Sequence, residues 1–453
     1  MHFVVELTKY LMLLIFGAYT YHAFRVSVKK NKNTRAISLR WMTCFLFLFH
    51  FTGYFTMYLQ VQNNKLVWLY GGELLVFILV LSLYKIIYPG ISELLLRNML
   101  MLLSLGYIIL TRLSFDKAVR QFLISAVALG LGLLVPIFIQ KYYDIRKYGW
   151  IYGIIGIFFL VLVLLIGTES YGATSWLTVF GLFTIQPTEF VKLLFVLCIA
   201  SLFSEGTDFK RVCAVTAMAG ATVLALVFQK DLGGALIFFV TYIFMLYGAT
   251  GKPLYLFFGL AGGSLASWIA YSLFDHVKVR VMAWRNPFGY IDKEGYQISQ
   301  SLFAIGTGGW FGMGLYQGLP TTIPVVDSDF IFSAISEEFG GLLALCLILL
   351  YINCFLILIN ISLKTSDDFY RLLSLGFTVM FGFQIFLSIG GVIKFIPSTG
   401  VTLPFISSGG SSMVATIIMF MVIQGIHSTA NTKMSVKAAA SLGGEIYDEK
   451  QKK

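Results

Sequence analysis

The sequence is poor in charged residues. Only 12% of its 453 residues are Asp, Glu, Lys or Arg, and 58% are hydrophobic, whereas a soluble domain carries about 25% charged residues. So few charges cannot cover a water-exposed surface, which excludes a soluble globular protein and indicates a polytopic membrane protein. The formal net charge of +11 does not predict a nucleic-acid partner, because the basic residues cluster at the ends of apolar segments. That placement is typical of membrane topology and of attraction to anionic membrane lipids or diphosphate groups.

Several motifs of common chemistry are also missing. The chain has no GxxxxGK(S/T) loop, which argues against an ATP-driven pump. The glycine-rich run from Gly306 to Gly314 lacks GxGxxG spacing and follows no strand, so it predicts close backbone packing rather than a nucleotide site. No organic cofactor is expected. The cysteines all fall inside apolar segments, without the spacing of a zinc site or a disulfide framework: Cys44, Cys198, Cys213, Cys346 and Cys354.

Long apolar segments, in contrast, are abundant. A membrane-spanning helix needs about 20 mostly apolar residues, and by this criterion we expect about thirteen spans. The weakest of them, Met99–Phe115, is short and carries Arg112. The predicted spans are Phe3–Phe24, Trp41–Val61, Leu66–Tyr88, Met99–Phe115, Phe122–Gln140, Trp150–Gly167, Pro187–Phe203, Val212–Phe228, Leu232–Tyr247, Leu254–Phe274, Phe330–Leu363, Leu372–Phe395 and Ser411–His427.

The basic residues predict the orientation of these spans. The first loop, from Arg25 to Arg40, is strongly basic and is therefore expected on the cytoplasmic side. Alternation then places the N-terminus outside, the C-terminus in the cytoplasm, and the long segment 275–329 outside. That segment is rich in glycine, charge and aromatic rings, and long loops of this kind are usually functional. The opposite short loops hold only Lys65, Lys117, Arg120 and Lys230.

A few ionisable residues lie within or next to the apolar spans, where they default to a functional hypothesis. Glu189 and Lys192 are three residues apart, so they share a helix face and can pair. Lys192 then either meets a phosphate near the outer surface or closes the bundle as a structural ion pair. Asp231 either belongs to a site or caps the helix that follows it. Glu73 and Lys394 lie near outer span ends and are expected to snorkel to the surface.

Six segments together resemble motifs of the SEDS family (shape, elongation, division and sporulation), which includes RodA, FtsW and SpoVE. They occur in family order between Gly172 and Ser412, so the resemblance is far more specific than any single match. The segments are Gly172–Trp176 (GATSW), Gln186–Lys192 (QPTEFVK), Gln229–Leu236 (QKDLGGAL), Ala283–Gly318, Asp329–Gly340 (DFIFSAISEEFG) and Phe395–Ser412 (FIPSTGVTLPFISSGGSS).

The resemblance implies an all-α core of ten transmembrane helices in the bacterial cytoplasmic membrane. It implies a glycosyltransferase that polymerises lipid II into peptidoglycan strands, for cell shape, division or sporulation. It also implies pairing with a class B penicillin-binding protein. In this sequence the core corresponds to residues 97–430, with 275–329 as its large outer loop. Residues 1–96 form an N-terminal extension of about three further spans, and 431–453 form a cytoplasmic tail.

The resemblance also assigns residues. The family's outer-loop stretch like LPExHTDF corresponds to Ile323–Phe330, which places the essential acid on Asp329. Trp176 and Lys192 correspond to the family's outer-loop tryptophan and intramembrane lysine. The sequence departs from the family at Val325, where a glutamate is usual, and at Asp327, where a histidine is common. Further departures are Ser175, Ser388 and Ser408, and together they leave a RodA-like or an FtsW-like role open.

On this basis we expect Asp329 to deprotonate the acceptor sugar hydroxyl, which attacks the anomeric carbon of the lipid-linked chain. The departing undecaprenyl diphosphate would be neutralised by Lys192, Arg280, Arg285 or a divalent cation. Asp327 and Asp329 could share such a cation, Mg²⁺ or Mn²⁺, through oxygen ligands. The other residues expected to bind substrate are Trp176, Glu189, Gln186, Asp231 and Ser411.

Other interpretations stay open at this point. A transporter that flips lipid II would explain Glu189 and Lys192 equally well, but it has no use for an acid fixed beside an outer loop. A non-catalytic scaffold for the penicillin-binding protein is a third possibility, favoured by the missing glutamate at Val325. Asp329 itself could simply cap the helix that follows it.

Overall fold

The computed structural model describes residues 2–141, 143–170, 173–179 and 183–451. Gly172, the first residue of the GATSW motif, therefore lies outside the described residues. Thirteen helical segments in the described chain are long and apolar enough to cross a membrane, which confirms the predicted all-α polytopic fold. They comprise α1 (His2–Val28), α2 (Lys32–Val61), α3 (Asn64–Ile87), α4 (Glu93–Leu113), α5 (Phe115–Gly132) with α6 (Leu134–Lys141), α7 (Gly149–Ile166), α8 (Pro187–Ser204), α9 (Phe209–Phe228), α10 (Leu232–Thr250), α11 (Pro253–Leu273), α14 (Ile331–Lys364), α15 (Asp368–Val392) and α16 (Gly410–Gln451).

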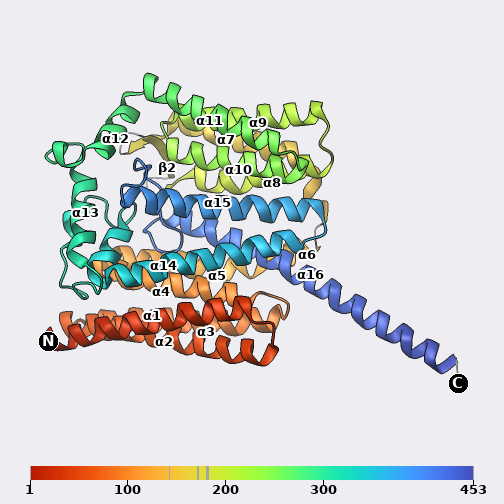
Figure 1. The fold of residues 1–453 in the computed structure, drawn as a ribbon, viewed down its shortest axis with the longest axis horizontal. Coiled ribbons are helices and arrows are strands. Elements are labelled where there is room, and N and C mark those ends of the chain that lie inside the picture. Colours follow the sequence, from red (N-terminus) through yellow and green to blue (C-terminus); the bar gives the residue numbers. More distant parts are fainter. Residues whose placement is uncertain (1, 142, 171–172, 180–182, 452–453) are drawn as a thin grey trace.

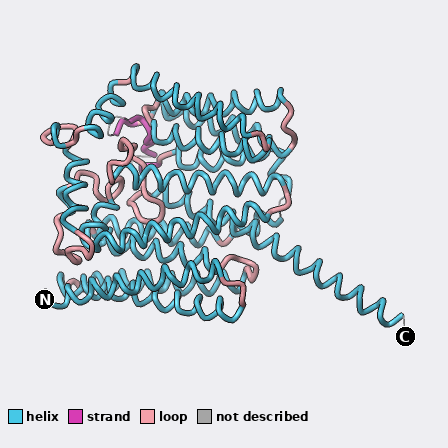
Figure 2. Tube along the Cα trace, viewed as in Figure 1, coloured by secondary structure: helices cyan, strands magenta, loops and turns pink. Residues whose placement is uncertain are grey.

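The helices run side by side along one common direction (Figure 1). Figure 2 shows that the strands and the longest loops gather at one end of this bundle, which we call the loop end. The N-terminus also lies there, whereas the C-terminus of the chain lies beyond the opposite end. The shorter elements are η1 (Tyr143–Tyr148), β1 (Thr168–Ser170), β2 (Ala173–Val179), β3 (Phe183–Ile185), α12 (Asp275–Arg285), η2 (Phe288–Tyr290), α13 (Tyr296–Gly308) and η3 (Pro320–Thr322).

The connection from α7 to α8 contains a small sheet that the sequence analysis did not predict. Its strands β1, β2 and β3 pair antiparallel in that order. Trp176 lies opposite Thr168, and Leu177 lies opposite Ile185. Threonine, tryptophan and branched aliphatic residues favour a pleated, half-buried strand, but a segment of this length between two spans gives no strong strand signal by itself. The sheet holds Trp176 at the loop end of the bundle.

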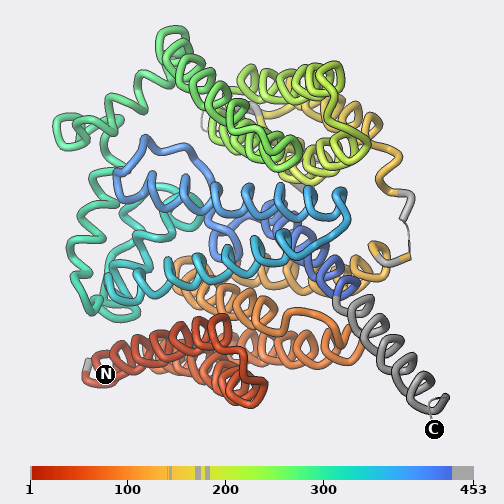
Figure 3. The backbone as a smooth tube through the Cα atoms, turned by 45° about the vertical axis from the view of Figure 1, so that its right-hand side comes forward, coloured from red at the N-terminus to blue at the C-terminus, as the bar shows by residue number. Residues whose placement is uncertain are grey.

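Helix α4, predicted as the weakest span, is the most enclosed one, with 94% of its most apolar window buried. Helices α1 to α3 cover one side of it, and α5 and α14 cover the other (Figure 3). Arg112 near its end is paired with Glu338 of α14, with 2.8 Å between Arg112 Nε and Glu338 Oε1. Helix α4 tolerates an arginine because protein, rather than lipid, surrounds it.

Polar side chains join the extension to the core inside the bundle. Tyr19 of α1 donates to Asn98 of α4, Asn98 donates to Asn353 of α14, and Asn353 donates back to Ser27 of α1. Hydrogen bonds between membrane helices are a main source of helix association, because burial from water does not drive it there. Four side chains therefore tie α1, α4 and α14 together.

A second buried polar contact joins Glu73 of α3 to His50 of α2. Glu73 does not snorkel to the surface. It is fully buried, with Oε2 3.4 Å from Nε2 of the equally buried His50 of α2. His50 Nδ1 in turn lies 3.0 Å from Ser104 Oγ of α4. The expectation rested on the place of Glu73 near a span end, and it failed because this face of α3 packs against α2 and the core.

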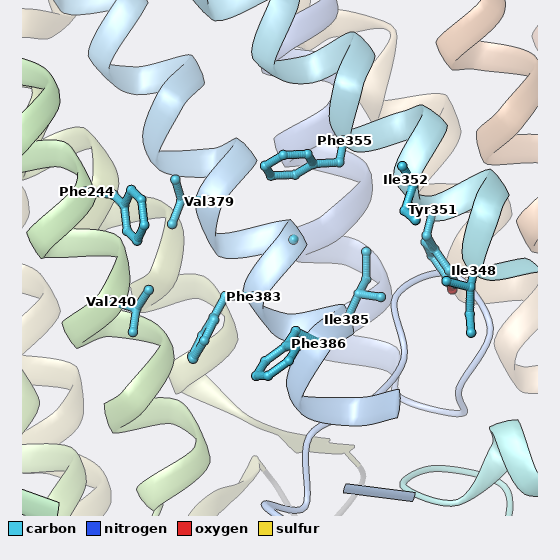
Figure 4. Close-up of a pocket in the computed structure, with 11 residues that line it drawn as sticks. Val240, Phe244, Ile348, Tyr351, Ile352, Phe355, Val379, Phe383, Ile385 and Phe386 are labelled. Atoms are coloured by element: carbon cyan, nitrogen blue, oxygen red, sulfur yellow. The ribbon is translucent and has the colours of Figure 1, made fainter. Parts of the chain in front are cut away.

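A pocket of about 330 Å³ opens between α10, α14 and α15 (Figure 4). Its lining is almost wholly apolar and includes Phe244, Phe355, Phe383 and Phe386. The one hydroxyl among its lining residues, that of Tyr351, is engaged by the Pro404 carbonyl. The pocket therefore offers space for hydrocarbon but no group for acid–base chemistry.

We predict that Asn353→Leu weakens the contact between the extension and the core. It removes the shared partner of Asn98 and Ser27, and leaving a buried polar group unpaired costs about 1–3 kcal/mol. Thermal unfolding of the detergent-solubilised protein, together with protease access to residues 29–31, would measure the loss. Asn360→Leu, at an exposed position of the same helix, is the control and should change stability by less than about 0.5 kcal/mol. Equal effects of the two variants would contradict the assigned role of Asn353.

Candidate functional site

A polar cavity of about 190 Å³ lies at the loop end, and we call it the Asp329 cavity. Its walls come from β2, α12, the starts of α10 and α16, and the segments before α14 and after α15. Residues far apart in the sequence thus meet at one point, and five of the six motif segments contribute to the lining; Ala283–Gly318 does not. The site residues predicted from the sequence that line it are Trp176, Gln186, Asp231, Arg280, Asp329 and Ser411.

Asp329 immediately precedes α14, but it does not cap that helix. Phe330 is the N-cap residue of α14, and no side chain makes a capping hydrogen bond there, so the capping interpretation of Asp329 is wrong. Burial raises the pKa of Asp329 from 3.8 to about 6, and the negative charge of Asp327 acts in the same direction. A hydrogen bond with Ser328 and the positive charge of Arg280 oppose the rise. The result is a carboxyl that is ionised at neutral pH yet more basic than an ordinary aspartate.

Gly400 leaves room next to this carboxyl. Its φ of +72° is a conformation that glycine adopts without strain. A Cβ at this position would lie 3.5 Å from Asp329 Oδ2. A side chain at residue 400 would therefore occupy part of the space next to the Asp329 carboxyl.

Asp231 does cap a helix, as one of the two interpretations proposed. Its Oδ1 accepts a hydrogen bond of 2.8 Å from the Gly234 backbone N–H at the start of α10. Burial raises the pKa of Asp231, while the Gly234 hydrogen bond and the positive charge of Lys192 oppose the rise. Since its side chain is committed to α10, Asp231 shapes the cavity wall and fixes the start of that helix.

Lys192 and Glu189 form a buried ion pair below the cavity. Lys192 Nζ lies 2.8 Å from Glu189 Oε1 and 3.1 Å from Gln384 Oε1 of α15. Gln384 then donates to the carbonyl oxygen of Thr402, which lines the cavity. Neither Lys192 nor Glu189 lines the cavity itself. The geometry thus favours the structural interpretation of this pair, with Gln384 linking it to the cavity wall.

Arg280 and Arg285, the two arginines of α12, line different cavities. Arg280 lines the Asp329 cavity, and its Nη1 lies 3.4 Å from the carbonyl oxygen of Ser398. Arg285 instead lines a separate hollow with Tyr271 and Asn286. Five residues on an α-helix correspond to a turn of about 140° around its axis, so the two side chains leave α12 on different faces. The structure therefore does not bring Arg285 to the site, contrary to expectation.

Asp327 faces a neighbouring cavity of about 460 Å³, which we call the Lys117 cavity. The Lys117 ammonium lies 2.8 Å from Asp327 Oδ2, and Arg120 lines the same cavity. In the part of the chain that the structure describes, no group of three or more His, Cys, Asp or Glu side chains is placed to hold a metal. With Asp327 turned to Lys117, the carboxylates do not fit a shared cation, and we derive no step through one.

Sequence reasoning missed Lys117 and Arg120 as site residues, although a signal was present. They are exceptions to the charge bias, because they are basic residues on the side predicted to be outside. The Lys117 cavity shares part of its lining with the Asp329 cavity, namely Trp176, Ser408, Gly409 and Ser411. The backbone N–H of Gln186 donates to Ser411 Oγ at 3.1 Å and holds α8 and α16 together at this junction.

An apolar groove of about 460 Å³ adjoins the Asp329 cavity on another side, between α9, α10, α11 and α15. We call it the α11 groove. Leu232, Arg280 and Thr399 line both the groove and the cavity. The Asp329 cavity thus shares lining residues with the basic Lys117 cavity and with the apolar α11 groove. This arrangement suits amphipathic ligands with a charged head and a long hydrocarbon chain.

Comparisons with known proteins identify the family of the chain. The family model FTSW_RODA_SPOVE, described as a cell cycle protein, matches residues 87–432. The chain is 32% identical to the peptidoglycan glycosyltransferase RodA of Mycobacterium tuberculosis over 378 residues, which cover 77% of this chain and 80% of the relative. It is 34% identical to stage V sporulation protein E of Bacillus subtilis over 325 residues, or 69% and 87% of the two chains.

Solved structures resemble the fold as well. A peptidoglycan synthase complex that coordinates polymerization and crosslinking matches with a TM-score of 0.63 and 27% identity over 75% of this chain and 98% of the other. The rod shape determining protein RodA of Thermus thermophilus matches with a TM-score of 0.54 and 25% identity, over 74% and 96% of the two chains. The family match begins at residue 87, so almost the whole extension precedes it.

We predict that Lys192→Met destabilises the fold by about 3–5 kcal/mol, because it leaves the Glu189 carboxylate buried without its cation. Combining it with Glu189→Leu should restore most of the loss, since no lone charge then remains. Unfolding midpoints in detergent would measure both changes. Lys210→Met, at an exposed position at the start of α9, is the control with the same substitution. A double variant no more stable than Lys192→Met would show that the pair is not a structural unit.

Proposed function

Because the chain belongs to the FtsW, RodA and SpoVE family and is a multi-pass membrane protein with peptidoglycan glycosyltransferase function, we propose that its substrate is lipid II. In this proposal the enzyme links disaccharides from lipid II into glycan strands and releases undecaprenyl diphosphate. The Asp329 cavity is the proposed reaction centre.

The observation that carries this proposal is the environment of Asp329. A general base works best when its pKa lies near the operating pH, and burial brings the pKa of Asp329 to about 6. In the proposed reaction the acceptor sugar hydroxyl gives its proton to Asp329 while its oxygen bonds to the anomeric carbon of the other substrate. The bond from that carbon to the diphosphate oxygen breaks, and both electrons leave with the diphosphate.

The departing diphosphate gains negative charge, and Arg280 is the residue placed to stabilise it. Arg280 lines the same cavity as Asp329, and a guanidinium recognises phosphate oxygens through two parallel hydrogen bonds. A fixed positive charge in an enclosed site stabilises a developing anion more than it would in water. We therefore assign to Arg280 the role that the sequence had left open among Lys192, Arg280, Arg285 and a divalent cation.

A polymerase must hold two lipid-linked substrates at once, and two spaces adjoin the Asp329 cavity. The α11 groove suits the prenyl chain of one substrate, because most of its lining is apolar and it ends at Arg280. The Lys117 cavity suits the diphosphate of the other, with Lys117 and Arg120 as its cations.

The same reasoning extends to orientation and partners. The basic first loop lies at the end of the bundle opposite the loop end, and the charge bias supports an Asp329 cavity on the outer face of the cytoplasmic membrane. The N-terminus is then outside and the C-terminus in the cytoplasm. The similarity to a complex that both polymerises and crosslinks supports pairing with a class B penicillin-binding protein. A lipid II flippase or a silent scaffold would not need a buried base beside an arginine.

We predict that Asp329→Asn abolishes polymerisation while the protein remains folded and inserted. Loss of a general base typically lowers the rate by about 10²–10⁴-fold. The assay is glycan formation from lipid II by purified protein in detergent, where flipping cannot generate a polymer. Asp292→Asn, in an exposed turn of the same outer loop, is the matched control and should keep full activity. Polymer formed at the normal rate by Asp329→Asn would exclude Asp329 as the base.

We also predict an acid limb in the pH profile of kcat/KM with a midpoint near pH 6, set by the raised pKa of Asp329. Below that pH the carboxyl is protonated and cannot accept the hydroxyl proton, so the rate should fall about tenfold per pH unit. Above it the carboxylate is ionised and the rate should reach a plateau. Asp292→Asn should leave the limb in place, whereas a midpoint near pH 4 would point to an ordinary, hydrated carboxylate.

A further inference from the structure

The helix α1 of the extension reaches the outer loop directly. Lys9 Nζ donates to the Gly312 carbonyl oxygen at 3.1 Å, and the Glu6 carboxylate holds the same ammonium at 2.9 Å. The ring of Tyr10 lies 5.6 Å from that of Phe311, centroid to centroid. Lys9 is largely buried, with 11% of its side chain exposed. A buried ammonium that donates to a loop carbonyl is an anchor rather than a snorkelling surface charge.

The contacted segment is a tight turn formed by residues 309–314, which we call the glycine turn. Gly309, Gly312 and Gly314 all have positive φ. Its backbone pairs with a kink in α14 at Gly340, through bonds from Gly341 N–H to the Gly309 carbonyl and from Met313 N–H to the Glu337 carbonyl. A Cβ on Gly312 would lie 2.4 Å from the Glu338 carbonyl oxygen. The glycine turn therefore packs so closely against the kink that a side chain at residue 312 has no space.

The kink also fixes the chain that leads toward Asp329. Glu337 Oε1 accepts the Leu319 backbone N–H at 2.9 Å. Arg112, bound to Glu338, donates to the Gly318 carbonyl oxygen at 3.1 Å and stacks on Tyr316. The ten residues from Ile331 to Gly340 form the first part of α14, directly after Asp329. Two fixed segments thus flank Asp329 in the chain. Before it is the loop that Arg112 and Glu337 hold at Gly318 and Leu319, and after it is the short first part of α14, which ends at the kink.

We propose that α1 positions the catalytic loop, with Lys9 as a positioning residue that holds the glycine turn against the kink of α14. The inference rests on the proposed role of Asp329 and goes beyond it, because it assigns a catalytic contribution to the extension. Lys9 touches no substrate. It acts by fixing the loop through Gly312, and thereby the place and the enclosure of the Asp329 carboxyl. Small displacements of a catalytic group, even from changes far from the chemistry, lower rates by up to about 10²-fold.

The test uses the full-length protein in detergent with lipid II as substrate. Lys9→Met keeps the length of the side chain and removes its charge and its N–H donors. We expect kcat to fall about ten- to hundredfold with KM little changed and a normal unfolding midpoint. We also expect the acid limb to move below pH 6, since a loosened loop admits water to the carboxyl and lowers its pKa.

Lys9→Arg should restore most of the rate, because the guanidinium can still donate to the Gly312 carbonyl. Lys65→Met, exposed near the start of α3, is the matched control and should match the unchanged protein. A normal kcat and acid limb in Lys9→Met would overturn the proposal, and so would a loss of folded protein with a normal rate per folded molecule. If Lys9→Met does not fold, Tyr10→Leu provides the same measurement on the neighbouring contact, and misfolding of both variants rejects a positioning role.

These outcomes are separate from the proposed function itself. If Asp329→Asn is inactive and Lys9→Met is normal, only the role of α1 fails. If Asp329→Asn polymerises lipid II, the assignment of the base fails first, whatever Lys9→Met shows.

Discussion

The interior of a bilayer contains no water to pair with polar groups, and this constraint determines where the buried charges of this protein lie. Arg112 is set against Glu338 across α4 and α14, and Lys192 is set against Glu189 and Gln384. Each of these buried cations has a carboxylate partner within the bundle. The polar groups that chemistry needs are thereby left to the loop end, where the chain is free of this requirement.

The Asp329 cavity is the product of that division. Its walls come from segments between the long helices, from the short helix α12 and from the starts of α10 and α16, and the long helices serve as a rigid frame that brings these parts together. Protein, rather than bulk water, encloses Asp329, and this enclosure makes its carboxyl more basic. The fold therefore fixes the position of the Asp329 carboxyl and raises its pKa by the same means. The α11 groove and the Lys117 cavity then connect this centre to an apolar space and to a basic one.

Much of this could be predicted from the sequence, because apolar length and motif order are local signals. The thirteen spans and the meeting of Trp176, Asp231 and Asp329 followed from them. What failed depended on tertiary neighbours. Glu73 was expected at a lipid-facing surface, and only the packing of α2 against α3 shows that it is buried. Arg285 was expected beside Arg280, but the two side chains leave α12 on different faces and line different cavities.

Other features depend on which segments or side chains are paired, and the sequence alone does not determine these pairings. The pairing of β1, β2 and β3 depends on contacts between segments of three to seven residues, too short to show a period. The partner of Asp327 could not be identified either, because Lys117 is 210 residues away in the chain. The capping of α10 by Asp231 was foreseen as one of two options, and the structure decided it by a single hydrogen bond.

The enclosure of α4 has a consequence for how the protein is made. A ribosome delivers the chain from its N-terminus, so α1, α2 and α3 enter the membrane before α4 is complete. Tyr19 and His50 are then already present when Asn98 and Ser104 arrive, and α4 can exchange lipid for protein on that face at once. Arg112 must wait much longer, because its partner Glu338 is synthesised 226 residues later. Helices α1 to α3 thus give α4 its protein neighbours on one face from the moment of its insertion, long before α14 is synthesised.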